Sequence, residues 1–426
     1  MALAEAFDVV IAGGGPGGAV TAARIAQKGR RVLVLEREVF PRFHLGESLL
    51  PESLVILEAI GLLPEVDRRF IRKPGAQFHD GYTDRTARFD FADAFTPRFS
   101  HAYQVERAVF DELLLRHAEA QGAVVRHEWS VTRMRLDGAR AIGVDATDAS
   151  GQPCSIDARF VVDATGREAL AARAARGVER LGTLDTTALY SQWSGVYRDP
   201  GVRAGDFHLV LLGDEAGDPK TAPPMGWFWF IPFKDGRTSV GLAASRAWMR
   251  RHAGEDPQTL YTRAIAGSKV ATRFLAGAEQ LWPARATADF SFRVRDLSGD
   301  GWVAVGDAGG FIDPLFSTGA HLAMHGGFHA ADAIDAALTA GDVSRARFQD
   351  WEASMRAGSD IFLNIVESFY DGVLSRILFA EKPHPYIRHV VTSLLAGNVF
   401  DEDSRWLADA RERMSRSALA RMLASS

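Results

Sequence analysis

A glycine-rich turn near the start of the chain limits the possible folds more than any other feature. The run "FDVVIAG" has the length and apolar character of a buried strand, and "GGGPGG" follows it, with Gly13, Gly15 and Gly18 in the spacing G-x-G-x-x-G. Helix-forming residues continue from Ala19 to Gln27, and "RVLVLE" is a second apolar run of strand length. Two buried strands joined by a helix make a βαβ unit with a parallel sheet. The sequence therefore predicts a Rossmann-like unit at the start of an α/β fold.

The spacing of these glycines predicts a dinucleotide site at the turn. Glycine at these places permits a tight turn, lets backbone N–H groups approach a pyrophosphate and lets helix and strand pack closely. The helix N-terminus then faces the negative charge. Glu36 ends the second strand, where its carboxylate can accept hydrogen bonds from ribose hydroxyls. The alternative interpretation is a glycine-rich turn with no ligand.

The rest of the chain predicts a mixed fold whose regions are interleaved. Residues 185–245 alternate with aromatics and glycines, as an antiparallel sheet would, and almost everything after Thr318 has helical character. We expect a nucleotide-binding region at 1–180 with a strand-rich insertion at 74–104, an antiparallel-sheet substrate region at 181–285, a return to the nucleotide-binding region at 286–340, and a helical C-terminal region at 341–426.

Composition excludes several classes of function. The net charge of −5 gives no electrostatic reason to expect nucleic-acid binding. The single cysteine, Cys154, excludes an intrachain disulfide and a multi-cysteine metal cluster and fits a reducing cytoplasm, and we expect no metal site. The apolar stretch 361–379 is interrupted by Asn364, Glu367 and Asp371, so it predicts an amphipathic helix and no membrane span. We find no signal peptide and expect a cytoplasmic protein.

Three further motifs resemble the FAD-dependent aromatic hydroxylase superfamily. "VVDATGRE" (161–168) and "GWVAVGDAGGFIDP" (301–314) each place an aspartate at the end of an apolar strand, and "QVERAVFDELL" begins a helix. The resemblance implies FAD, with Asp307 on its ribityl chain, Asp163 near the pyrophosphate and Arg107 near the cofactor. It also implies that Arg37, Ser48, Gly306 and Pro314 belong to the cofactor-binding set.

A second group of motifs resembles the flavin-dependent halogenases within that superfamily. Residues 227–232, "WFWFIP", match the signature W-x-W-x-I-P, and "FIDPLFSTG" (311–319) matches F-x-x-P-x-x-S-x-G. The loop "FPRFHLGESLLP" (40–51) and Lys73 in "RKPGAQF" complete the group. The resemblance is strongest to halogenases that act on phenols, pyrroles or carrier-bound substrates.

The resemblance assigns a role to each of these motifs. FADH2 and O2 would turn chloride or bromide into hypohalous acid, and Trp227 and Trp229 would keep the substrate away from the flavin. Lys73 would guide the oxidant, either by a hydrogen bond or as a haloamine, since a lysine amine loses its proton readily on burial. Ser317 would belong to the catalytic set. Thr318 and Gly319 would bind the halide, because a helix N-terminus suits an anion.

Simpler interpretations of the same residues remain open at this point. Trp227 and Trp229 alternate along a strand, so both can lie on one face as core. Lys73 can be a surface lysine at the end of the charged "RRFIRK", although Pro74 biases it toward an extended backbone. The related alternatives for the whole chain are an FAD-dependent hydroxylase, an isoprenoid-chain reductase, or a flavin-binding protein without turnover.

One departure from the family pattern bears on the substrate. Tryptophan-specific halogenases carry a glutamate two residues before the threonine, and this chain has Phe316 there. We therefore expect an electron-rich phenol or pyrrole, free or bound to an acyl or peptidyl carrier protein, in a cavity between the sheet and the C-terminal helices. The candidates for the base that removes the ring proton are Glu47, His44, His321 and Asp313. No second dinucleotide fingerprint is visible, so we expect a separate flavin reductase to supply FADH2.

Overall fold

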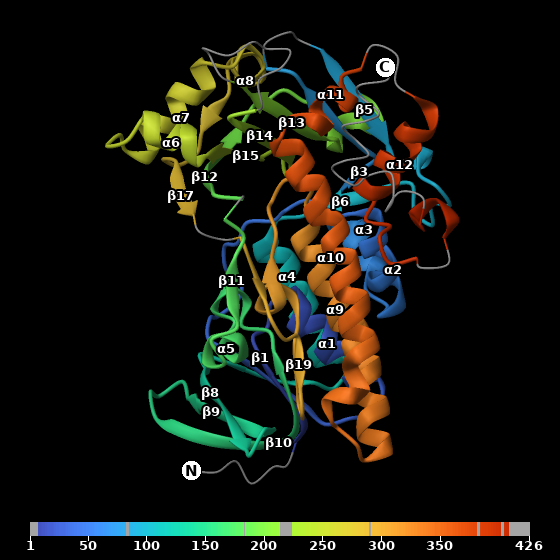
Figure 1. Ribbon diagram of the computed structural model, residues 1–426. Coiled ribbons are helices and arrows are strands. Elements are labelled where there is room, and N and C mark those ends of the chain that lie inside the picture. Colours follow the sequence, from blue (N-terminus) through green and yellow to red (C-terminus); the bar gives the residue numbers. More distant parts are fainter. Residues whose placement is uncertain are drawn as a thin grey trace.

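The computed structural model describes residues 7–81, 85–182, 184–213, 224–288, 291–380, 384–401 and 404–408. Two large sheets lie toward opposite ends of the molecule, and the two longest helices run along one side of it (Figure 1). The predicted mixed α/β fold with a Rossmann-like unit is confirmed. The limits of the four regions remain predictions.

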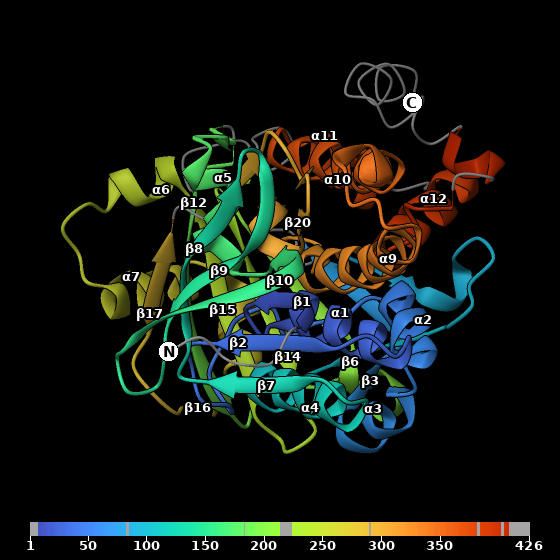
Figure 2. The same ribbon diagram turned by 90° about the horizontal axis from the view of Figure 1, so that it is seen from below.

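The first sheet is built on the βαβ unit that the glycine motif predicts. Its central strands run parallel in the order β20-β10-β1-β2-β7, which Figure 2 shows from below. Val9 and Ile11 belong to the largest cluster of buried apolar side chains, called the main core below. Val10, on the other face of the sheet, packs against the ribbon of β8 and β9. Both faces are covered, which explains the uninterrupted apolar runs. The strands are β1 (Phe7–Ala12), β2 (Val32–Glu36), β7 (Val124–His127), β8 (Ser130–Asp137), β9 (Arg140–Thr147), β10 (Pro153–Asp163), β19 (Ser298–Gly299) and β20 (Trp302–Ala304).

The second sheet contains the predicted antiparallel strands together with part of the 74–104 insertion. Its order is β16-β12-β15-β14-β13-β4-β5, with β17 also paired to β12, and only the β13–β4 pair is parallel among these. The strands are β4 (Gly75–His79), β5 (Thr86–Asp90), β12 (Thr186–Ser194), β13 (Phe207–Leu212), β14 (Gly226–Pro232), β15 (Thr238–Ser245), β16 (Glu279–Gln280) and β17 (Arg285–Ala288).

Strand β14 carries the paired tryptophans, and its two faces belong to different cores. Trp227 and Trp229 face the main core, while Phe228 and Phe230 pack on the far face. The second core is closed by α6 (Arg246–Arg251), α7 (Pro257–Ala266) and α8 (Lys269–Phe274). Alternation along a strand therefore explains why four large rings follow one another in the sequence.

The remaining helices cover the first sheet and the main core. Helices α1 and α9 approach closely, since a Cβ on Gly327 would lie 2.5 Å from the carbonyl oxygen of Gly17. The helices are α1 (Pro16–Gln27), α2 (Pro51–Ala59), α3 (Leu63–Arg69), α4 (Arg107–Ala120), α5 (Leu170–Ala174), α9 (Thr318–Ala340), α10 (Gln349–Tyr370), α11 (Val373–Leu378) and α12 (Pro385–Leu395). Two short pairings complete the fold: β3 (Ile71–Lys73) with β6 (Ala102–Gln104), and β18 (Phe292–Val294) with β11 (Val178–Arg180) and β21 (Gly310–Phe311).

The segment 361–379 differs from the single amphipathic helix expected there. Helix α10 ends at Tyr370, and Gly372 takes φ +74°, a left-handed conformation that glycine adopts at little cost, before α11 begins. Among the described residues, no helix is long and apolar enough to cross a membrane.

Candidate active site

The glycine turn between β1 and α1 has the geometry of a pyrophosphate cradle. Gly13 takes φ +107°, and a Cβ on it would lie 2.2 Å from the carbonyl oxygen of Ala164. A Cβ on Gly18 would lie 2.0 Å from the carbonyl oxygen of Gly13, so neither position tolerates a side chain. Around Gly15, by contrast, the nearest atom to such a Cβ is Nη2 of Arg42 at 3.6 Å. The turn itself requires Gly13 and Gly18, and Gly15 leaves its outer side open to a ligand.

Arg42 is a functional candidate that the sequence analysis missed. Its buried Nη1 makes no hydrogen bond, although it lies 3.4 Å from Oδ2 of Asp111 in an ion pair. Its Nε pairs with Glu38 at 2.9 Å. The nitrogen nearest to the open side of Gly15 is Nη2, and a guanidinium placed there is suited to a phosphate oxygen. The available signal was its place in the motif "FPRFHLGES", four residues before Gly46.

The carboxylates expected around the cofactor differ in how many hydrogen bonds they already accept from the protein. Glu36 accepts hydrogen bonds from the backbone N–H of Gly14 (2.7 Å) and of Glu38 (2.9 Å). Asp163 is saturated, because it accepts from the backbone N–H of Ala171 and from both the N–H and the hydroxyl of Thr165. Contact between either carboxylate and a cofactor stays a prediction.

Asp307 is the carboxylate that the described residues leave without a hydrogen-bond donor. It lies in the turn Gly306–Gly309, where Gly306 takes φ +62°. Burial raises the pKa of Asp307 to about 6, against the opposing positive charges of Arg107 and Arg167, and no described residue donates a hydrogen bond to it. An acceptor of this kind is suited to a ribityl hydroxyl. With the glycine cradle and Arg42, it fits the binding of FAD. Arg37 lies at the surface, paired with Glu168.

The loop Leu45–Leu49, which contains the sequence G-E-S, is held in place by Val105 and Arg107 at the start of α4. Nη1 of Arg107 donates to the carbonyl oxygen of Leu45 at 2.7 Å, and the N–H of Val105 donates to the carbonyl oxygen of Glu47 at 2.7 Å. Arg107 is itself fixed by two hydrogen bonds to Asp111 (2.7 and 2.9 Å). The loop is therefore rigidly placed, and its polar groups point in set directions.

Lys73 ends β3 and points into this loop. It is 2% exposed, and its Nζ donates to Oγ of Ser48 at 2.8 Å and to the carbonyl oxygen of Leu49 at 2.9 Å. Burial lowers the pKa of Lys73 to about 7, although Asp206 opposes the shift. The interpretation of Lys73 as a surface lysine is wrong, and the extended backbone expected before Pro74 is confirmed.

Trp227 and Trp229 are both buried, at 1% and 5% exposure, with ring centroids 5.8 Å apart. The indole N–H of Trp229 donates to Oγ of Ser239 at 3.2 Å, and this hydroxyl donates to Oε2 of Glu47 at 2.9 Å. The G-E-S loop thus connects to Trp229 through Glu47 and to Lys73 through Ser48. Burial raises the pKa of Glu47 to about 7.

Trp227 has a matching connection on the opposite side. Its indole N–H donates to the hydroxyl of Tyr370 at 3.0 Å, and Tyr370 lies 3.2 Å from each carboxylate oxygen of Asp313. Asp313 is 1% exposed, and burial raises its pKa to about 7. Each tryptophan is therefore held through a hydroxyl to a buried carboxylate. A buried indole N–H usually needs such a partner, so these hydrogen bonds fit a core tryptophan as well as a functional one.

The segment after Asp313 forms the start of α9. The N–H of Ser317 donates to the carbonyl oxygen of Pro314 at 3.2 Å, and Ser317 takes φ +59° before the helix begins at Thr318. A Cβ on Gly319 would lie 3.0 Å from the ring of Phe311. The first-turn N–H groups of a helix lack intrahelical acceptors, so this start can hold an anion. A halide there stays a prediction.

Phe316 lies at 6% exposure and packs edge-to-face on Phe369 at 6.2 Å. It lines a small cavity of about 10 Å³ between β4 and the C-terminal helices, which has room for about one water and is too small for an aromatic ring. None of its lining residues belongs to the sheet of residues 185–245, where we expected the substrate cavity. The cavity walls are apolar throughout: Phe78, Phe316, Phe362, Ile365, Leu374, Leu378, Val391, Leu394 and Leu395.

The other two candidate bases lie elsewhere. His44 is exposed, with Nδ1 2.6 Å from the carbonyl oxygen of Leu45. His321 is buried in the contact between α9 and α2, with Nδ1 3.2 Å from Oγ of Ser53. Among the described residues, no group of three or more His, Cys, Asp or Glu side chains could hold a metal ion.

Comparisons with known proteins agree with this geometry. The chain matches the family described as tryptophan halogenase over residues 8–92 and 83–374. A tryptophan 2-halogenase of Chondromyces crocatus is 31% identical over 379 residues, 87% of this chain and 69% of that protein. A 1H-pyrrole-2-carbonyl peptidyl-carrier-protein brominase of Pseudoalteromonas luteoviolacea is 28% identical over 408 residues, 93% of each. The solved structure of the myxobacterial chondrochloren halogenase, an FAD-dependent halogenase, matches with a TM-score of 0.78 at 30% identity, covering 97% of this chain and 99% of that one.

The cradle at β1 and the unpaired carboxylate of Asp307 fit a flavin, and the matched family and relatives place the chain among the FAD-dependent oxidoreductases. The chain belongs to the tryptophan halogenase family: it is a flavin-dependent halogenase, an enzyme that uses FAD and a halide. The resemblance to halogenases is confirmed, and the hydroxylase and reductase alternatives are not needed.

The cradle generates a prediction about FAD binding. Gly15 has φ −66° and ψ −178°, which valine adopts readily, so Gly15→Val should fold. Its side chain would fill the approach of the pyrophosphate, and FAD affinity should fall by about 100-fold or more. Fluorescence titration of the apoprotein with FAD measures this. Gly182→Val, at an exposed position with no atom within 4 Å, is the control and should bind as the parent does. A Gly15→Val protein that retains full FAD affinity would contradict the prediction.

The connection from Trp227 generates a second prediction. Tyr370→Phe removes the acceptor of a buried indole N–H, so the free energy of unfolding should fall by about 1–3 kcal/mol. Tyr197→Phe removes a hydroxyl that bonds Asp199 on a half-exposed side chain, and its effect should stay within about 0.5 kcal/mol. Denaturant unfolding of both variants measures the difference. Equal stabilities would show that Tyr370 is not needed as the partner of Trp227.

Proposed function

We propose that the enzyme halogenates an electron-rich aromatic substrate and that Lys73 carries the oxidised halogen to it. The observation that carries the proposal is the G-E-S loop, which contacts Lys73 through Ser48 and Leu49 and Trp229 through Glu47 and Ser239. FAD, when bound and reduced, supplies with O2 the oxidising chemistry that turns chloride or bromide into hypohalous acid. Side chains of the protein carry out the remaining steps.

The hydrogen bonds of Lys73 suit the transfer of a halogen. A neutral amine has two N–H donors, which Ser48 and Leu49 accept, and one lone pair that remains free. The lone pair attacks the halogen of hypohalous acid: an N–halogen bond forms, the halogen–oxygen bond breaks, and the departing hydroxide takes the amine proton to leave water. A ring carbon of the substrate then takes the halogen and gives up a proton, which restores the amine.

Trp227 and Trp229 separate the two halves of this reaction. Both rings are locked by hydrogen bonds through Tyr370 and Ser239, so they form a rigid wall. Such a wall would keep the substrate from the flavin. The halide is held at the N-terminus of α9 by Thr318 and Gly319, with Ser317 shaping the turn before them.

The apolar surroundings of Phe316 suit an uncharged ring better than a charged one. No carboxylate is among the residues that line the small gap beside Phe316, so a cationic intermediate would have to be stabilised by electron donation within the substrate, as in a phenol or pyrrole. The related pyrrole brominase acts on a ring attached to a carrier protein, and we include a carrier-bound ring among the substrates. A separate reductase supplies FADH2, and the single Cys154 suits a cytoplasmic location.

The function is tested directly with the purified enzyme, a flavin reductase, FAD, NADH, O2 and bromide. A panel of phenols, pyrroles, a carrier-bound pyrrole and free tryptophan is analysed by mass spectrometry for the paired bromine isotopes. We expect brominated phenol or pyrrole and little brominated tryptophan. Tryptophan as the preferred substrate would overturn the substrate proposal.

The role of Lys73 generates a separate prediction. Lys73→Ala should bind FAD and still consume bromide to hypobromous acid, which monochlorodimedone traps, while brominated product falls by about 100-fold or more. Lys73→Arg should fail too, because a guanidinium keeps its proton and has no free lone pair. Lys269→Ala, at an exposed lysine, is the control. A Lys73→Ala enzyme that forms product at the parent rate would overturn the proposed role.

A further inference from the structure

Asp313 is a buried carboxylate that the transfer of a halogen by Lys73 does not use. It is 1% exposed and lies five residues before the start of α9 at Thr318. Its Oδ1 accepts a hydrogen bond from the backbone N–H of Leu315 at 2.9 Å. The hydroxyl of Tyr370 lies 3.2 Å from each of the two carboxylate oxygens. The backbone therefore occupies one oxygen of Asp313 and leaves Oδ2 to Tyr370.

Tyr370 is the group through which a proton can reach Asp313. It ends α10, is only partly buried, and accepts the indole N–H of Trp227 at 3.0 Å. An indole nitrogen only donates, so the hydroxyl hydrogen of Tyr370 is free to point at the carboxylate of Asp313. The second lone pair of this hydroxyl can take a proton while its own hydrogen moves to Asp313.

Thr186 offers the hydroxyl of Tyr370 a second acceptor. Oγ1 of Thr186 is buried and makes no hydrogen bond with any described residue. It is near enough to the hydroxyl of Tyr370 to oppose the rise in pKa that burial causes there. When Asp313 carries a proton and donates it to Tyr370, this hydroxyl can turn toward Thr186. Every polar hydrogen of the group then keeps an acceptor in both protonation states of Asp313.

The other candidate bases are placed less suitably. Glu47 belongs to the same loop that holds Lys73, the side from which the halogen arrives. His44 is exposed, and His321 faces Ser53 in the contact between α9 and α2.

The chemistry requires a proton acceptor other than Lys73. A ring carbon that takes a halogen becomes tetrahedral, and its hydrogen bends away from the incoming halogen. The proton therefore leaves on the side of the ring away from Lys73, where an acceptor must lie within hydrogen-bond reach. Lys73 is connected to Trp229 through the G-E-S loop, whereas Asp313 is connected to Trp227 through Tyr370.

We propose that Asp313, acting through the hydroxyl of Tyr370, accepts the proton that the substrate ring releases on halogenation. The carbon–hydrogen bond breaks, and its electron pair restores the aromatic ring. The proton passes to the oxygen of Tyr370 while the hydroxyl proton passes to Oδ2 of Asp313. Asp313 gives its proton to water as the product leaves, and water supplies the proton that restores the amine of Lys73. This inference rests on the proposed function and adds the base that the reaction needs.

Bromination of a ring-deuterated phenol tests the proposal, because electrophilic substitution shows a primary isotope effect only when loss of the ring proton limits the rate. The parent should show none. Asp313→Asn keeps an oxygen for the N–H of Leu315 but is too weak a base, so brominated product should fall by about 100-fold and an isotope effect should appear. Tyr370→Phe should behave alike. Both variants should still form hypobromous acid at the parent rate, as trapped by monochlorodimedone.

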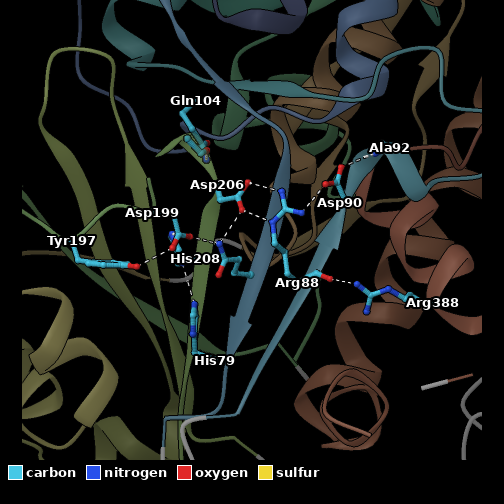
Figure 3. Close-up of polar contacts among 12 residues, drawn as sticks. His79, Arg88, Asp90, Ala92, Gln104, Tyr197, Asp199, Asp206, His208 and Arg388 are labelled. Carbon is cyan, nitrogen blue, oxygen red and sulfur yellow. Dashed lines mark hydrogen bonds and ion pairs between the residues drawn. The ribbon is translucent and has the colours of Figure 1, made fainter. Parts of the chain in front are cut away.

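A second tyrosine–aspartate pair provides the matched control. The hydroxyl of Tyr197 donates to Asp199 at 2.9 Å, beside His208 of the second sheet (Figure 3). Asp199→Asn should brominate at the parent rate, without an isotope effect.

The isotope effect separates proton transfer from a purely structural role. Less product without an isotope effect in Asp313→Asn would show that Asp313 only supports Trp227, and would overturn the inference, as would unchanged product. If Tyr370→Phe does not fold, Asp313→Asn decides alone. A parent enzyme that brominates no phenol or pyrrole would overturn the proposed function, and this inference with it.

Discussion

The anchoring of the loop Leu45–Leu49 by Arg107 is the interaction on which the rest of the site depends. Arg107 is buried, and its charge is balanced by two hydrogen bonds to Asp111 one helical turn further along α4. Its remaining donor holds the carbonyl oxygen of Leu45. A buried charge of this kind is tolerated only with full pairing, and it therefore allows few arrangements of the loop. Helix α4 also packs against α1, so the support of the loop and the cofactor cradle share one framework.

The fixed loop in turn positions two side chains that are distant in sequence, Lys73 and Trp229. Lys73 comes from a three-residue strand, and Trp229 from the middle of the second sheet. Lys73 donates to Ser48 of the loop, and Trp229 is connected to the adjacent residue Glu47 through Ser239. Because buried polar groups must be paired, moving either side chain would leave a buried donor or acceptor unsatisfied. The distance between Lys73 and Trp229 is thus held by hydrogen bonds as well as by packing.

Burial shifts the pKa values of three ionisable side chains at the candidate site. The same apolar surroundings that lower the pKa of Lys73 raise those of Glu47 and Asp313, since both effects disfavour the charged form. In each case a neighbouring group opposes the pKa shift that burial causes: Ser239 for Glu47, Tyr370 for Asp313 and Asp206 for Lys73.

The sequence by itself determined the βαβ unit, the glycine cradle, the alternation of Trp227 and Trp229 on one face of a strand, and the start of a helix at Thr318. Each is a local property: glycine spacing, apolar runs and strand periodicity act over a few residues and are legible in order along the chain. The family and the FAD followed from motifs of the same kind. Only the tertiary structure decided that Lys73 is buried, because its local sequence "RRFIRK" is typical of a surface, and burial depends on the G-E-S loop, Phe91 and Phe207 closing over it. The contacts of Arg42 and Tyr370 were hidden for the same reason, since their partners lie on other elements, and no pattern within one segment records a contact between two.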